Sequence, residues 1–213
     1  MLFQLVKKDF LLVKKYVLIM ITLCIILPLF LIRSLPEYAG ILGFVLITVY
    51  SVSMLLQYVF LKETQFPKAS ALLCALPYPR KDIVLSRYIF CMIIYVACCV
   101  IFGIETLVVP QLGTFGFAMP VMLFLVISLF LGIYLPVHYK LGYEKTKFFF
   151  IIIIMGSSFV FPQLIKIERG MDLSFLDVLN PAILLGSAIL FSIIILVVSA
   201  IISVQIYKKA DLL

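Results

Sequence analysis

Charged residues are scarce in this sequence. They make up 13% of its 213 residues, whereas 65% of the residues are hydrophobic and the mean hydropathy is +1.28. A soluble domain is roughly half apolar and about a quarter charged. Because surface-to-volume scaling limits the apolar surface that a chain of this length can bury, a water-soluble fold is excluded. The solvent for most of this chain is therefore lipid.

Motifs that carry catalysis are missing as well. The sequence has no GxxxxGK[ST] motif, and therefore no P-loop for ATP phosphates, and it has neither GxSxG nor HExxH. Its single histidine, His138, has no second ligand beside it, and we interpret it as an interfacial side chain. No apolar stretch contains a pair of acidic residues. These absences disfavour an intramembrane enzyme and predict no cofactor in this chain.

The five cysteines show no metal-ligand spacing. Cys24, Cys91, Cys98 and Cys99 lie within apolar stretches, and Cys74 lies in a polar segment. A cysteine in a membrane commonly serves as a small apolar side chain, and we interpret these residues in that way.

Six apolar stretches are long enough to cross a bilayer. A hydrocarbon core about 30 Å thick needs roughly 20 helical residues. The stretches cover residues 16–33, 39–61, 88–109, 116–137, 148–165 and 181–207. The sequence therefore predicts an all-α membrane protein, with one transmembrane domain over residues 1–213 and six transmembrane helices.

The basic residues are divided unequally between the two sides of these stretches. Fourteen lysines and arginines lie on one side: before the first stretch, between the second and third, between the fourth and fifth, and after the sixth. The other side has three, namely Arg33, Lys166 and Arg169. The positive-inside rule then predicts that both termini are cytoplasmic. The net charge of +7 is thus a topology signal, and no nucleic-acid partner is expected.

The N-terminal residues 1–15 have the pattern of a basic amphipathic helix. At about 100° per residue, four lysines and Gln4 share one arc, and apolar residues cover most of the rest. Such a helix is suited to lie along the inner leaflet in contact with lipid. Asp9 breaks the pattern because it points into the apolar face. A contact between this helix and a partner subunit is the alternative.

The segment 62–87 is the longest polar part of the chain. It contains a short apolar helix candidate, ASALLCAL, that is stopped by Pro77 and Pro79. A new helix is expected to begin near Pro79 to Asp82. A short apolar helix between two spans is suited to a groove on another protein, although it could also rest on lipid headgroups.

Glu105 is an acidic residue within the third stretch. A carboxylate inside a membrane is costly and is a candidate functional site. Because Glu105 lies near the outer end of the stretch, it could instead reach the interface. It is a possible intramembrane polar site.

Two motifs resemble the permeases of ABC-2 type transporters, of the small six-span kind found mainly in Gram-positive bacteria. The first is an acidic residue followed by an LPxxRxx[IV]Vxx[KR]Y pattern, matched here by Glu63, Leu76-Pro77-Tyr78-Pro79-Arg80, Ile83-Val84 and Arg87-Tyr88. The second follows the fourth stretch and reads PVHYKLGYEKTK over residues 136–147. Pro79 departs from the family pattern, which often has a small polar residue there, and leaves the helix start less defined.

The resemblance implies a permease subunit in the bacterial plasma membrane. A second permease, identical or related, would complete the pathway, and a separate cytoplasmic ABC ATPase would bind ATP and Mg²⁺. Residues Ala69 to Leu76 would form the coupling helix that binds this ATPase, and Gly142 to Lys145 would make a second, smaller contact. The coupling residues implied are Glu63, Leu72, Leu73, Leu76, Pro77, Arg80, Gly142, Tyr143 and Glu144.

The substrate is inferred from resemblance to similar-sized permeases. Among such permeases, this chain most resembles exporters of amphipathic peptides, such as staphylococcal phenol-soluble modulins, and bacteriocin self-protection systems. Apolar spans with little buried charge suit an amphipathic peptide better than a bare ion, which needs compensating polar groups. Two alternatives stay open: an exporter of lipid-like or drug molecules, and a membrane scaffold or accessory subunit without a pathway of its own.

Overall fold

The computed structural model describes residues 2–34, 39–65, 79–112, 116–146, 148 and 181–210. All regular secondary structure in these residues is helical, as the sequence predicts. Within these residues, five helices are long and apolar enough to cross a membrane. They are α2 (Lys14–Ser34), α3 (Ala39–Gln65), α5 (Arg80–Val108), α6 (Ala118–Leu141) and α9 (Pro181–Ala210). The predicted sixth span, 148–165, lies outside the described residues.

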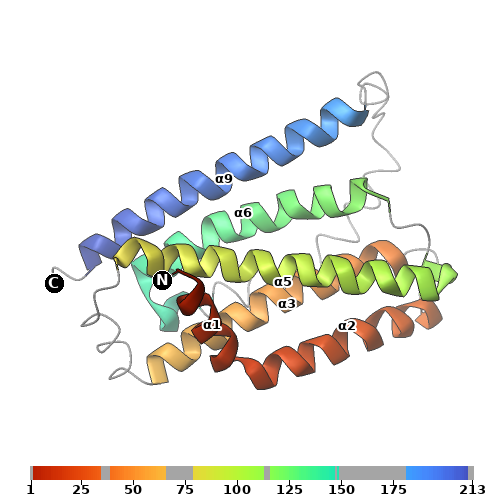
Figure 1. Cartoon of the computed structure of the whole chain (residues 1–213), viewed down its shortest axis with the longest axis horizontal. Coiled ribbons are helices and arrows are strands. Elements are labelled where there is room, and N and C mark those ends of the chain that lie inside the picture. The colour runs from red at the N-terminus through yellow and green to blue at the C-terminus, as the bar shows by residue number, and fades with distance from the viewer. Residues whose placement is uncertain are drawn as a thin grey trace.

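The five long helices run side by side (Figure 1). Helix α3 is the most buried of them, and it packs against α2 and α5, whereas α9 packs against α6 and α5. Many large apolar side chains remain exposed on the outside of the bundle, most of all on α2 and α9. That surface is expected of helices whose surroundings are lipid, because lipid does not penalise exposed apolar groups.

The bundle has two distinct ends (Figure 1). Helix α1 (Leu2–Leu12) lies at one of them, together with the start of α5 and the ends of α3, α6 and α9; we name it the α1 end. The short 3₁₀ helix η1 (Pro110–Leu112) lies at the other, which we name the η1 end. Helix α6 therefore finishes at the α1 end, and α9 begins at the η1 end.

Helix α1 packs into the bundle with one face, which differs from a helix that only rests on lipid. Leu5, Val6 and Asp9 are its buried residues, and α1 contacts α5, α3 and α2. Its exposed face carries Phe3, Lys7 and Leu11. The predicted helix over residues 1–15 is interrupted at Val13, after which α2 begins at Lys14.

The polar segment predicted over residues 62–87 is helical at both of its described ends. Helix α3 continues to Gln65, and α5 begins at Arg80, directly after the extended residue Pro79 (φ −63°, ψ 130°). This start confirms the expectation of a new helix near Pro79 to Asp82. Asp82 lies in the first turn, where a negative charge is favourable to the helix dipole. The candidate helix ASALLCAL lies outside the described residues.

Candidate functional site

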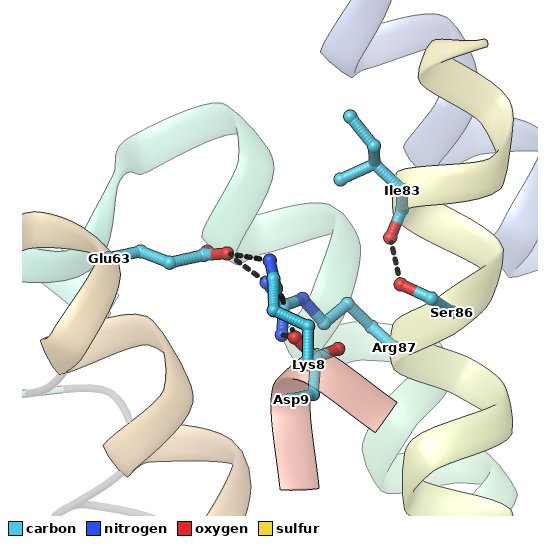
Figure 2. Close-up of polar contacts among 6 residues, drawn as sticks. All are labelled: Lys8, Asp9, Glu63, Ile83, Ser86 and Arg87. Atoms are coloured by element: carbon cyan, nitrogen blue, oxygen red, sulfur yellow. Dashed lines mark hydrogen bonds and ion pairs between the residues drawn. The ribbon is translucent and has the colours of Figure 1, made fainter. Parts of the chain in front are cut away.

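Four charged side chains from three helices meet at the α1 end (Figure 2). Lys8 and Asp9 come from α1, Glu63 from α3 and Arg87 from α5. Arg87 Nη1 lies 2.7 Å from Asp9 Oδ1, and Arg87 Nη2 donates to Glu63 Oε1. Lys8 Nζ lies 3.4 Å from both Asp9 Oδ1 and Glu63 Oε1. We name these four residues the ion-pair cluster.

The centre of the ion-pair cluster is shielded from solvent. The side chains of Asp9 and Arg87 are 0% and 1% exposed, whereas Lys8 and Glu63 are partly exposed. Burial raises the pKa of the Asp9 carboxyl, while the neighbouring Arg87 and Lys8 act in the opposite direction. Two acids and two bases leave the cluster with no net charge. The pairing explains why an acid stands on the apolar face of α1: that face packs on α5, where Arg87 meets it.

Aromatic rings enclose the cluster on the side of α3 and α6. The guanidinium carbon of Arg87 lies 5.5 Å from the ring centre of Phe60, close enough for a cation–π contact. The His138 ring stacks on the same phenylalanine, with centroids 3.5 Å apart. His138 is buried, so its interpretation as an interfacial side chain was wrong. The reason is that α6 turns this residue toward α3, which a lone histidine in a sequence does not reveal.

Tyr88, the residue after Arg87 in α5, forms hydrogen bonds on the opposite side of the bundle. Its hydroxyl is hydrogen-bonded to Ser199 Oγ at 2.6 Å and to Ser203 Oγ at 3.0 Å, both on α9. Ser199 donates its proton to the carbonyl of Gly132 on α6, at 3.0 Å. Because neighbouring helical residues point about 100° apart, Arg87 and Tyr88 bind different partners. The Arg87–Tyr88 pair thus connects α1 and α3 on one side with α6 and α9 on the other.

The predicted GYEK contact lies at the same end, directly after α6. Gly142 ends the helix with φ +77°, a conformation that favours glycine, and its N–H donates to the His138 carbonyl at 2.9 Å. Thr146 donates to the Gly142 carbonyl at 2.7 Å and closes the turn. Tyr143 packs partly buried against the core, and Glu144 is exposed.

The remaining predicted coupling residues are divided between described and undescribed parts. Glu63 lies in the ion-pair cluster, and Arg80 is the first residue of α5. Leu72, Leu73, Leu76 and Pro77 lie outside the described residues. The structure adds Lys8, Asp9 and Arg87, which sequence reasoning did not assign to the site. A signal was available for two of them: Asp9 interrupts an apolar face, and Arg87 belongs to the first family-like motif, directly before its last residue, Tyr88.

Glu105 lies far from this cluster, at the η1 end of α5. It lines an apolar groove of about 390 Å³ between α2 and α5. Both carboxylate oxygens are shielded from solvent and have no hydrogen-bond partner in the described part of the chain. Glu105 lies in the last turn of α5, near the end of the span as the sequence indicates, in a groove that residues of α2 and η1 also line.

The ion-pair cluster forms a polar link between helices, in which charges of α1, α3 and α5 are paired. Displacing one of these helices would leave a buried charge unpaired. Among residues 2–34, 39–65, 79–112, 116–146 and 181–210, no group of three or more histidine, cysteine or acidic side chains is placed to hold a metal ion.

A family described as ABC-2 family transporter protein matches residues 4–208. No curated protein and no solved structure matches the chain.

Proposed function

This chain belongs to the ABC-2 family of transporter proteins, and from that membership we propose that it is the permease subunit of an ATP-driven ABC exporter. A separate cytoplasmic ATPase binds ATP and Mg²⁺ in this proposal, since the sequence has no P-loop of its own. The observation that carries the proposal is the family match over residues 4–208, which covers nearly all of the five described spans.

The proposed topology has six spans in the bacterial plasma membrane, with both termini and the α1 end in the cytoplasm. The unequal distribution of lysine and arginine supports this orientation. The positions of α6 and α9 also support it. Helix α6 ends at the α1 end and α9 begins at the η1 end, as one further crossing over residues 148–165 would require. The exposed face of α1, with Phe3, Lys7 and Leu11, suits contact with the inner leaflet.

Cysteine labelling tests this topology. In a background whose five native cysteines are replaced, Pro36→Cys and Gly170→Cys are expected to react with a membrane-impermeant maleimide added outside the cells. Lys68→Cys and Lys145→Cys are expected to react only after the membrane is permeabilised. Outside labelling of Lys145→Cys would contradict the proposed orientation.

Coupling to the ATPase is assigned to residues 63–88 and 142–145. The apolar side chains Leu72, Leu73 and Leu76 would fill a pocket on the ATPase, with Pro77 ending their helix. Arg80 and Glu144 together would hold the two contacts in register with each other. The ion-pair cluster supports this proposal because Glu63 and Arg87, near the two ends of the range 63–88, pair with each other and with Lys8 and Asp9 of α1. ATP-driven closure would then move the spans of two permease chains as rigid bodies.

The proposed substrates are amphipathic peptides of the phenol-soluble modulin kind, which would give the exporter a role in virulence or self-immunity. The apolar outer surface of the bundle supports substrates that enter sideways from the membrane. Lipid-like or drug molecules share this chemistry and are the alternative substrates.

Cells that lack the transporter should retain amphipathic peptides or become more sensitive to them. An unchanged response across a panel of such peptides would contradict the proposal.

The Leu73→Asp variant tests the coupling helix. The substitution would place a charge in an apolar contact at a cost of several kcal/mol, about the desolvation penalty of an unpaired polar group. We expect the variant to insert normally but to lose the ATPase in a pull-down from solubilised membranes. Leu11→Asp is the matched control, because Leu11 is an exposed leucine at the same end of the bundle.

The pull-down separates the proposed permease from its alternatives. Loss of the ATPase by Leu73→Asp with retention by Leu11→Asp supports the coupling helix. Retention of both the ATPase and transport by Leu73→Asp would mean that this loop is only a linker on the headgroups. A wild-type chain that isolates no ATPase at all would favour a scaffold or accessory subunit.

A further inference from the structure

The groove beside Glu105 combines an apolar wall with a single acid. Its lining comes from α2, from α5, from η1 and from the one residue between α5 and η1: Ile25, Leu29, Ile101, Ile104, Glu105, Val108, Val109 and Leu112. Seven of these eight residues are aliphatic. The volume of about 390 Å³ falls within the range of small-molecule sites, roughly 300–1,000 Å³. The groove is therefore large enough for a compact organic group.

The acid in this groove has no partner within the described chain. Neither oxygen of Glu105 has a hydrogen-bond partner among the residues that the structure describes, which include Arg33 in the last turn of α2. A carboxylate that is shielded from water and unpaired is costly, because it has lost hydration without gaining a donor. A positively charged ligand would remove that cost.

We propose that this groove binds the cationic group of an amphipathic molecule, with the ammonium or guanidinium at Glu105 and the apolar part along α2 and α5. The charge selects a cation, because an anion would face the carboxylate and none of the described lining residues is basic. Access is from the lipid, since Ile25, Leu29 and Val108 are all exposed on the outside of the bundle. Such a site concentrates lipophilic cations at the η1 end of the helix bundle.

Binding at this site is independent of the ATPase, and only its role in export rests on the proposed function. A failure to bind cations would leave the permease assignment intact. Loss of ATPase association, in turn, would leave cation binding unchanged. The two ideas can therefore fail separately.

Binding of tetraphenylphosphonium to the full chain in zwitterionic nanodiscs tests the site. Radiolabelled cation should bind saturably above the level of empty nanodiscs. Glu105→Gln should weaken the affinity about tenfold or more, the size expected when a charge-assisted contact is lost. Tetraphenylborate, an anion of similar size and shape, should show no loss in the same variant. Equal binding of the cation by wild type and Glu105→Gln would overturn the proposal.

Three further variants keep the test decisive if Glu105→Gln is unstable. Glu105→Asp retains a carboxylate and should retain most of the binding. Ile25→Trp fills the groove from α2 without changing the acid, and should weaken binding. Adding Leu107→Glu to Glu105→Gln moves the carboxylate to a side chain that is 84% exposed and outside the groove, so binding should not return. Recovery by this last variant would show that any acid near the membrane surface suffices.

Discussion

Arg87→Met is expected to lower the free energy of unfolding by about 3–5 kcal/mol, the usual cost of removing one partner from a buried ion pair. Arg87 is 1% exposed and pairs with Asp9, which is 0% exposed, so the substitution leaves a buried carboxylate without its closest cation. Methionine is a long apolar side chain and limits the cavity that results. Reversible unfolding in mixed micelles, followed by circular dichroism, measures the difference.

Lys8→Met is the matched control for this substitution. Lys8 contacts the same two acids, but from a partly exposed position and at 3.4 Å. Solvent screens such a pair, and its loss should cost less than about 1 kcal/mol. Equal destabilisation by Lys8→Met and Arg87→Met would show that the burial of Arg87 does not increase the contribution of its ion pairs to the free energy of unfolding.

A double-mutant cycle identifies the pairing more directly. Asp9→Asn removes the buried charge that Arg87→Met leaves behind, so the double variant should be more stable than the sum of the single changes implies. A coupling energy near zero would contradict a direct Asp9–Arg87 interaction. Glu63→Gln in the same cycle measures the second pair of the cluster.

Gly132→Leu is expected to destabilise the contact between α6 and α9 by roughly 1–3 kcal/mol, the range for overpacking a filled interior. A Cβ at this position would lie 2.9 Å from Ile195 Cγ2, closer than van der Waals contact allows. The carbonyl of Gly132 also accepts the Ser199 hydrogen bond, so separating the helices weakens the polar link through Tyr88. Thermal unfolding in micelles measures the effect.

Gly186→Leu provides the control, because a Cβ at this glycine of α9 meets nothing within 4 Å. The same change there should be neutral or slightly stabilising, since leucine favours helix more than glycine does. Combining Gly132→Leu with Ile195→Ala removes the methyl group that clashes and should recover part of the stability. If Gly186→Leu is as harmful as Gly132→Leu, the cause is not the close approach of α6 and α9.

The sequence by itself determined that this chain is a helical membrane protein and where most of its spans lie. The physical reason is that a lipid solvent makes composition decisive: a span needs about 20 apolar residues and satisfies its backbone hydrogen bonds internally. It also singled out Glu63 and predicted the start of the helix near Pro79, because motif residues and prolines are local signals. Asp9 already stood out as an acid on an apolar face.

Only the tertiary structure decided which groups meet. Asp9, Glu63 and Arg87 lie on three different helices, and no periodicity within one helix indicates a partner on another. The same holds for Tyr88 and Ser199, which are 111 residues apart, and for His138, whose buried ring stacks on Phe60. The long helices α2, α3, α6 and α9 are apolar on most of their surface, so hydrophobicity alone does not mark the face that packs. The faces that pack are decided by the close approach of α6 and α9 at Gly132 and by the pairing of the few charged side chains. Both depend on the arrangement of the helices in space.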